Sequence, residues 1–330
     1  MRRSDRSPRD HYTEITEQFI AALEAGTPPW RQPWDSAKAG GPCMPQNAST
    51  GVRYRGINVL TLGMSPLAFM TGDPRWATYK QAQGLGWQVK KGSRGITGFF
   101  YKRIEIDRDD DGGEEARGSG QWFPLLRSFT LFHASQIEGI SPYVPPTVAE
   151  APWRAPEAAE TIVRNSGAQI RIGGDRAFYS TATDHIQMPP QAAFRSPAAW
   201  ASVELHELSH WSGSGARLQR DLSGKFGSES YAREELRAEI AQVMVCAELG
   251  IPDCDFTNDA AYISYWLTKL RSDKKEIFRA ATDAQRIADY LLAFYPDWTS
   301  STRSTGGDAQ TKGPRPHEDD LPAAEFSQAA

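Results

Sequence analysis

A pair of histidines with an adjacent glutamate is the part of this sequence best suited to chemistry. The run His206-Glu207-Leu208-Ser209-His210 follows the pattern H-E-x-x-H. Side chains at positions i and i+4 lie on one face of an α-helix, so both imidazoles can bind one Zn²⁺ ion. Glu207 can then act as general base on a water molecule whose pKa the metal lowers. The two histidines could instead merely share a helix face, but a chain with only 6 histidines makes that interpretation weak.

A catalytic zinc site of this kind needs a third protein ligand. The next histidine along the chain is His317, too far away in sequence to continue the motif. We therefore expect a carboxylate from the acidic run 234–239, with Glu235 as the ligand and Glu239 orienting an imidazole from behind. Glu234 stays open as an alternative ligand, and any of these glutamates could simply lie on a solvated helix face. Two histidines and a glutamate favour Zn²⁺, although another divalent metal stays open.

The elements around the motif predict a mostly helical second half. Residues 197–212 contain no glycine and no proline after the first position, which favours a helix carrying the motif. The acidic run lies on a second predicted helix, 230–249, which Gly250 and Pro252 bring to an end. The other expected elements are a helix at about 157–166, strands at 169–172, 177–180 and 185–188, and helices at 257–271 and 274–294.

The first half of the chain has a different charge and a different predicted architecture. Residues 1–104 carry a net charge of +8, whereas residues 105–330 carry −12. Such a split indicates an anion-binding half, although a basic face that only contacts solvent explains it equally well. Helices are expected at 10–25 and 76–85, and strands at 87–89, 96–106 and 123–134. This mixture predicts a small α+β domain with an acidic, glycine-rich insertion at 107–120.

Aromatic and cationic residues alternate in this first half, which is the composition of a single-stranded nucleic-acid site. Cations follow the phosphates of such a strand, and aromatic rings stack on its bases. The sequence lacks the patterns of a helix-turn-helix or a zinc finger, so it does not support sequence-specific reading of duplex DNA. Some of the tryptophans could instead be core residues. The candidate DNA-binding residues are Trp30, Trp34, Asn47, Tyr54, Arg55, Asn58, Tyr79, Lys80, Gln81, Lys90 and Lys91.

The chain is long enough for two domains, since a domain averages roughly 150 residues. We expect a disordered N-terminus at 1–9, a DNA-binding domain at 10–141, a proline-rich linker at 142–156, a metallopeptidase domain at 157–298 and a disordered tail at 299–330. No apolar run approaches the roughly 18 residues that a membrane span requires, and the N-terminus lacks the apolar core of a signal peptide. The 3 cysteines are too few for a disulfide framework. We therefore expect a cytoplasmic protein with no membrane partner.

Several segments resemble a known family. The run Leu23-Glu24-Ala25-Gly26-Thr27-Pro28-Pro29-Trp30-Arg31-Gln32-Pro33-Trp34 is similar to the N-terminal domain of ArdC-type antirestriction proteins. So are Pro45-Gln46-Asn47-Ala48-Ser49-Thr50-Gly51, Tyr54-Arg55-Gly56-Ile57-Asn58 and Thr78-Tyr79-Lys80-Gln81-Ala82. The segment from Asp184 to Pro189, the motif at 206–213 and the acidic run 234–239 resemble the zincin-like metallopeptidase domain of that family. The acidic insertion and the long tail depart from the family pattern.

The resemblance implies an α+β protein in which a small single-stranded-DNA-binding domain precedes a mostly helical, gluzincin-like domain. It implies an antirestriction protein of a plasmid or other conjugative element, which would protect an incoming single strand from host restriction. Whether its metallopeptidase domain cleaves a protein or peptide substrate stays open. One alternative is a DNA-recruited zinc metallopeptidase whose main function is proteolysis. Another is a DNA-binding module with a purely structural metal, which the presence of Glu207 disfavours.

Overall fold

The computed structural model describes residues 10–26, 44–105, 122–144, 151–225, 227–251, 259–296 and 298. Chain contacts divide it into two compact units, of which the first holds the described residues up to Phe99 and from Ser128 to Trp298. The second holds the described residues between Phe100 and Arg127. The predicted disordered ends (1–9 and 299–330), the insertion 107–120 and the candidate DNA-binding residues Trp30 and Trp34 lie outside the described residues.

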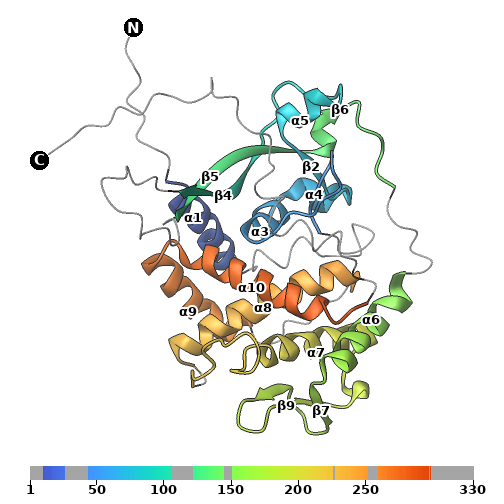
Figure 1. Ribbon diagram of the computed structural model, residues 1–330, viewed down its shortest axis with the longest axis vertical. Helices are drawn as coiled ribbons and strands as arrows, with labels where there is room; N and C mark the ends of the chain where they lie inside the picture. The colour runs from blue at the N-terminus through green and yellow to red at the C-terminus, as the bar shows by residue number, and fades with distance from the viewer. Residues whose placement is uncertain are drawn as a thin grey trace, which may run out of the picture. The chain divides into compact units, whose positions relative to one another are not determined.

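The N-terminal part combines a four-stranded sheet with short helices (Figure 1). The strand order is β1-β2-β5-β4, with β1 parallel to β2 and β2 antiparallel to β5. Two further strands, β3 and β6, form a separate antiparallel pair. The strands are β1 (Gln46–Asn47), β2 (Arg75–Ala77), β3 (Gln88–Val89), β4 (Ile96–Glu105), β5 (Trp122–His133) and β6 (Ile137–Glu138). The helices are α1 (His11–Glu24), α3 (Ile57–Gly63), α4 (Pro66–Thr71), α5 (Tyr79–Gly84) and the 3₁₀ turn η2 (Ala134–Gln136).

Trp76 shows where the sequence-based prediction of this part is wrong. The predicted helix 76–85 begins only at Tyr79, because Thr78 caps it and Trp76 instead lies in β2 opposite His133. Trp76 is fully buried, packs with Leu62 and meets the His133 ring edge-to-face at 4.8 Å. Burying a large aromatic side chain in a sheet core outweighs the local preference for a longer helix.

His133 should make the stability of the fold depend on pH. Its ring is fully buried, with Nε2 2.7 Å from the carbonyl oxygen of Asp73 and Nδ1 accepting from the Ser135 amide at 3.1 Å. Burial lowers the pKa of His133 below its ordinary value of 6.5. Below about pH 6.5 the unfolded chain therefore binds a proton at His133 that the folded chain does not bind. The free energy of unfolding consequently decreases as the pH is lowered.

We expect chemical denaturation to show this fall between pH 7 and pH 5, and to show a smaller fall for the His133→Gln variant. Each tenfold difference in proton affinity between the two states is worth about 1.4 kcal/mol. The ionisable groups elsewhere are common to both proteins, so the difference between the two curves isolates His133. Parallel curves would show that His133 does not titrate differently on folding.

The C-terminal part is a layer of helices with a small three-stranded sheet of order β7-β9-β8 (Figure 1). β7 pairs in parallel with β9, and β8 pairs antiparallel with β9. Because β9 is the central strand, β8 is an edge strand. The strands are β7 (Gln169–Ile172), β8 (Phe178–Ser180) and β9 (His185–Met188). The helices are α6 (Ala151–Ser166), α7 (Pro197–Trp211), α8 (Glu229–Leu249), α9 (Asp259–Ser272) and α10 (Glu276–Leu292), with the 3₁₀ turn η3 (Gln191–Ala193).

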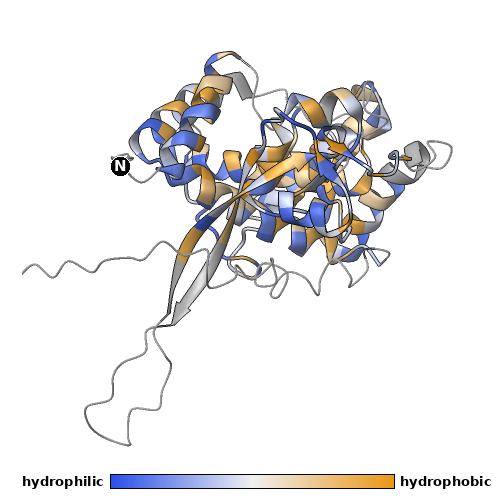
Figure 2. Cartoon of the chain, turned by 90° about the horizontal axis from the view of Figure 1, so that it is seen from above, coloured by the Kyte–Doolittle hydropathy of each residue, from blue (hydrophilic) through white to orange (hydrophobic). Residues whose placement is uncertain are grey.

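Local capping sets the bounds of the two helices that matter for the site. Ser196 accepts a hydrogen bond from the Ala199 amide at the start of α7, where Pro197 follows the cap. Ser228 caps α8 in the same way, and Gly250 ends α8 with a left-handed φ of 73°. Every residue of α8 from Ala238 to Ala247 is buried, so this helix is the centre of the C-terminal core. The helices in Figure 2 carry both orange and blue residues, as expected for amphipathic helices.

The division of the chain is less sharp than the sequence predicts. Helix α6 begins at Ala151, so its first turns occupy the end of the predicted linker 142–156. Helix α1 packs on the C-terminal helices α9 and α10 (Figure 1): the Thr16 hydroxyl donates to the Lys274 carbonyl at 2.8 Å. Tyr12 meets Phe278 of α10 edge-to-face at 4.7 Å. Within the described residues, no helix is both long enough and apolar enough to cross a membrane.

Candidate metal centre

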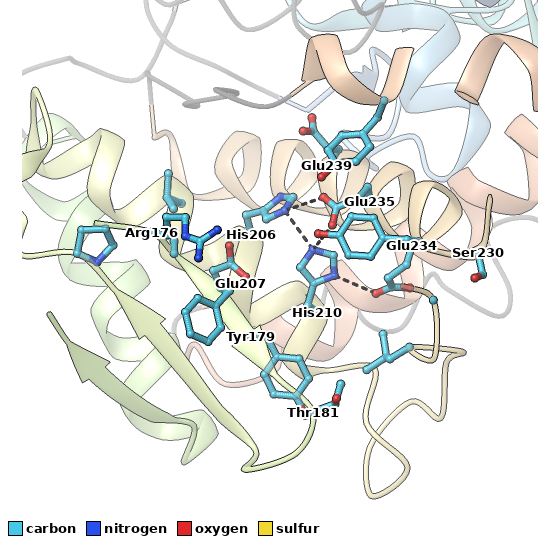
Figure 3. A pocket seen from close by; sticks show the side chains of 18 of the residues that line it. Arg176, Tyr179, Thr181, His206, Glu207, His210, Ser230, Glu234, Glu235 and Glu239 are labelled. Carbon is cyan, nitrogen blue, oxygen red and sulfur yellow. Dashed lines mark hydrogen bonds and ion pairs between the residues drawn. The ribbon is translucent and has the colours of Figure 1, made fainter. Parts of the chain in front are cut away.

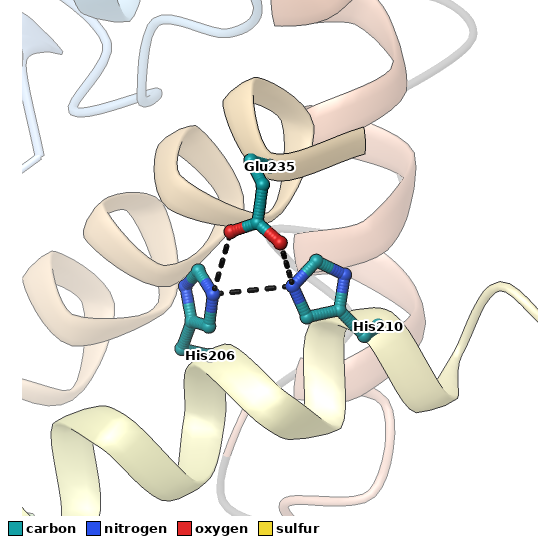
Figure 4. Close-up of side chains that lie close together, drawn as sticks. All are labelled: His206, His210 and Glu235. Carbon is teal, nitrogen blue, oxygen red and sulfur yellow. Dashed lines mark hydrogen bonds and ion pairs between the residues drawn. The ribbon is translucent and has the colours of Figure 1, made fainter. Parts of the chain in front are cut away.

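Helix α7 holds the two motif histidines against a glutamate of α8. His206 and His210 lie one turn apart, with their Nε2 atoms 3.1 Å from each other. Each Nε2 is 3.4 Å from one carboxylate oxygen of Glu235 (Figure 4). The three donor groups lie within 4.8 Å of one another. Of the two glutamates that the sequence left open as ligands, Glu235 is the one that faces both imidazoles.

Side chains behind the imidazoles fix which ring nitrogen carries the proton. Gln242 donates its amide to the Ser202 carbonyl at 3.0 Å, so its oxygen is left to accept from Nδ1 of His206 at 3.2 Å. Nδ1 of His210 lies 3.2 Å from a carboxylate oxygen of Glu234. A proton held on Nδ1 leaves Nε2 of each ring, the nitrogen that faces Glu235, as the one that can bind a metal ion. This is the arrangement that a metal-binding histidine requires.

Glu234 and Gln242 thus occupy the position behind the imidazoles that the sequence analysis predicted for Glu239. Glu239 lines the same cavity, one turn beyond Glu235. No sequence pattern singled out Gln242, because an amide in a buried helix is more often a packing residue. Nor did any pattern single out Arg220, which donates to Glu234 at 2.6 Å and to the Ser209 carbonyl at 2.6 Å. Arg220 thus fastens the loop that follows α7 to α8.

The electrostatics of the site favour a bound cation. Burial opposes ionisation of Glu235, but the charge and hydrogen bonds of His210 and His206 hold its pKa below the ordinary value. Burial likewise opposes protonation of His210, yet Glu235 and Glu234 raise its pKa well above 6.5. The glutamates therefore stabilise positive charge at the point where the donor atoms converge, whether a proton on His210 or a bound metal ion carries it. The donor set therefore fits a divalent metal ion.

Glu207 lies beside this cluster and faces the same cavity (Figure 3). Its carboxylate accepts a hydrogen bond from the backbone amide of Tyr179 on the edge strand β8. Burial raises the pKa of Glu207, which makes its carboxylate a stronger base. The edge strand therefore aims the side chain that the sequence assigns as general base.

The cavity has a volume of about 560 Å³ and lies between α7, α8 and β8. Tyr231 and Tyr262 line the cavity next to the three candidate metal ligands, and neither tyrosine was singled out from the sequence. Burial, together with the nearby charge of Glu235, raises the pKa of Tyr231. The Tyr179 hydroxyl donates to Asp184 at 2.8 Å and accepts from Arg217 at 3.1 Å.

The candidate DNA-binding residues separate into two groups. The first group already has structural roles, because its members bond to backbone groups, pack in the core or form an ion pair. Asn47 accepts from the Ser49 amide at 2.9 Å, Asn58 bonds to both backbone groups of Phe99, and Gln81 completes the cap of α5. Tyr54 packs against the Trp76 cluster, and Arg55 pairs with Asp289 of α10. The second group is exposed and consists of Tyr79, Lys80, Lys90 and Lys91, although the Lys90 ammonium also donates to the Ser135 carbonyl at 2.9 Å.

Comparison with known proteins agrees with this architecture. Residues 9–132 match the N-terminal domain of anti-restriction factor ArdC, and residues 157–283 match a zincin-like metallopeptidase. The chain is 40% identical over 296 residues to the protein y4eC of Sinorhizobium fredii, covering 89% of this chain and 95% of that one. It is 42% identical over 299 residues to the DNA primase TraC of Escherichia coli, but spans only 20% of that relative's length.

Solved structures give the same result. The antirestriction protein ArdC from the R388 plasmid is 38% identical, with TM-scores of 0.70 for its metal-free crystal structure and 0.69 for its Mn(II)-bound one. The similarity covers 88% of this chain and 100% of the ArdC chain. The expected mixed α+β fold, with an N-terminal sheet and a helical zincin-like part, is thereby confirmed. The chain belongs to the ArdC family of antirestriction proteins.

Proposed function

We propose that this protein binds single-stranded DNA through residues 10–141 and hydrolyses peptide bonds at a metal centre within residues 157–298. The observation that carries the catalytic half is the convergence of His206, His210 and Glu235 beside Glu207 in one cavity. Membership of the ArdC family supports an antirestriction role, and relatives on the R388 plasmid and among TraC proteins support a place on mobile DNA.

His206, His210 and Glu235 are the proposed ligands, and Zn²⁺ is the proposed ion, because two imidazoles and a carboxylate form a common zinc donor set. Mn(II) is the ion in one crystal structure of ArdC. When bound, such a cation polarises a carbonyl oxygen and makes water more acidic. Glu207 supplies the proton transfers: its carboxylate takes a proton from the attacking water and returns it to the leaving amine. The Tyr179 amide holds that carboxylate in place.

The position of Glu207 also disfavours a purely structural metal. A structural zinc site is closed by four protein ligands. Here the three donors border a cavity of about 560 Å³ that also holds Glu207. An open position next to a buried carboxylate is the arrangement of a hydrolytic site rather than of a structural one.

The DNA-binding half of the proposal rests on the exposed group of candidate residues. Helix α5 carries Tyr79 and Lys80, and it packs against β3, which is followed by Lys90 and Lys91. Tyr79 is 47% exposed, so its ring is available for stacking on a base. The three lysines are exposed and can follow the phosphates of a flexible strand.

Replacing Lys90 and Lys91 together by alanine should weaken binding of a fluorescent single-stranded oligonucleotide and reduce its salt dependence. Each phosphate contact to a single strand contributes roughly 0.7 to the slope of log affinity against log salt concentration. We therefore expect the slope, measured by fluorescence anisotropy, to fall by about 1.4 for two contacts.

A matched control removes the same charge elsewhere. Arg164→Ala combined with Lys225→Ala changes two exposed cations of the C-terminal part and should leave the slope unchanged. Equal slopes for the native chain and the Lys90/Lys91 variant would exclude these lysines from the DNA interface.

A further inference from the structure

The cavity beside His206, His210 and Glu235 is lined by a positively charged side chain whose role the proposed reaction does not explain. Among the described residues that line the cavity, Arg176 is the sole lysine or arginine. It lies in the turn between β7 and β8, two residues before the edge strand begins. Figure 3 shows its guanidinium on the same side of the cavity as Glu207. A substrate held against β8 would therefore pass close to it.

Arg176 has no partner within the described part of the chain. Its exposed side chain forms no ion pair or hydrogen bond with another described residue. The other arginines near the site are all engaged: Arg217 donates to the Trp211 carbonyl at 2.6 Å, and Arg220 to Glu234. A guanidinium has five donors in a planar fork that matches a carboxylate. Arg176 is therefore the group in this cavity that is available to bind an anion.

Six carboxylates line the same cavity (Asp175, Glu207, Asp221, Glu234, Glu235 and Glu239), and most of them are engaged by other groups. Glu235 faces the two imidazoles, and Glu234 is paired with Arg220 and His210. Asp221 accepts from both the amide and the hydroxyl of Ser223, at 3.0 Å and 2.6 Å. Asp175 is exposed and could attract a cationic group, so a cationic ligand has to be part of any test.

We propose that Arg176 selects peptide substrates that carry a carboxylate next to the bond presented to Glu207. This inference rests on the proposed peptidase function and names the substrate class of that site. The carboxylate can come from the C-terminal end of a peptide or from an acidic side chain. Both would form charge-assisted, two-pronged hydrogen bonds with the guanidinium.

Binding of one alanine-rich, fluorescein-labelled hexapeptide to the full chain tests this. Four forms are compared: a free C-terminal carboxylate, a C-terminal amide, and amides with one internal glutamate or one internal lysine. Anisotropy is measured on the metal-free chain, so that no peptide is cleaved and no carboxylate can bind a metal ion. We expect at least one carboxylate form to bind about tenfold tighter than the plain amide.

Arg176→Gln should abolish that preference, and Arg176→Lys should keep part of it. Arg171→Gln is the matched control, because Arg171 is an exposed arginine of β7 that does not line the cavity. Loss of preference for the free C-terminus identifies the terminal carboxylate as the ligand, and loss for the glutamate peptide identifies the side chain. The proposal would be overturned if the lysine peptide bound most tightly, if all forms bound equally or if the native chain bound none of them. It would also be overturned if the preference survived in Arg176→Gln.

Cleavage of the same peptides by the Mn²⁺-loaded chain, followed by mass spectrometry, separates this inference from the proposed function. Binding that depends on Arg176 without any cleavage would refute peptide hydrolysis alone. Cleavage of all four forms at equal rates by the native chain and by Arg176→Gln would refute the role of Arg176 alone.

Discussion

Glu207→Gln should abolish peptide hydrolysis while leaving metal binding and DNA binding intact. Glutamine has the same shape and keeps an oxygen that can accept from the Tyr179 amide, but it cannot take up a proton from water. Loss of a general base typically reduces a rate by about 10²- to 10⁴-fold. We expect a loss of that size in the rate at which the metal-loaded chain cleaves an unstructured protein, as measured by gel electrophoresis.

Glu204→Gln provides the control on the same helix. Glu204 is 2% exposed, and burial followed by the nearby charge of Glu160 raises its pKa to about 8. Its side chain is therefore largely neutral at pH 7, and a neutral glutamine should leave cleavage unchanged. Cleavage by Glu207→Gln at the rate of the native chain would remove Glu207 from the reaction.

Glu207→Gln also distinguishes an antirestriction function that does not need proteolysis from one in which proteolysis is the main function. If plasmid transfer into a restricting host is protected equally by the native chain and by Glu207→Gln, protection does not need proteolysis. If protection is lost together with cleavage, proteolysis is the main function, and DNA binding serves to recruit the enzyme. Single-stranded-DNA affinity, measured in parallel, should be equal in both proteins.

Glu235→Ala should lower the affinity for Zn²⁺ and Mn²⁺ by more than 100-fold. It removes the carboxylate that lies 3.4 Å from both Nε2 atoms and leaves two imidazoles as the donors of the cluster. Glu234→Gln should have a smaller effect, because Glu234 only orients His210 through Nδ1. Losing such an outer partner costs about 10- to 100-fold in metal affinity.

Titration against a competing chelator measures these affinities. Glu229→Ala changes an exposed glutamate of the same helix and should bind metal like the native chain. Affinity unchanged in Glu235→Ala, or lost more completely in Glu234→Gln, would exchange the roles that we give to these two neighbours.

Features set by residues close in sequence could be predicted well. The strands at 169–172 and 185–188 and the end of α8 at Gly250 agree with the structure. Helices α3 and α4 were missed, because their short apolar runs have no length over which a helical period can be recognised. The start of α6 at Ala151 was also missed, since proline-rich sequence favours a linker unless a neighbouring element supports a helix.

Contacts between distant residues could not be predicted in the same way. Arg55 carries the pattern of a phosphate-binding residue, yet it pairs with Asp289, which lies 234 positions away. Gly56 is fixed in the same region by a bond from its amide to Gln285 at 3.0 Å. The packing of the helices determines which distant residues become partners, and a local pattern in the sequence does not predict these pairs.

The sequence by itself determined that His206 and His210 share a helix face and that an acidic helix follows them, because the i,i+4 geometry of an α-helix is local. Only the tertiary structure decided that Glu235 faces the Nε2 atoms while Glu234 and Gln242 lie behind the rings. Adjacent residues on a helix point about 100° apart. The rotation of α8 against α7, fixed by their buried packing, therefore gives each glutamate its place.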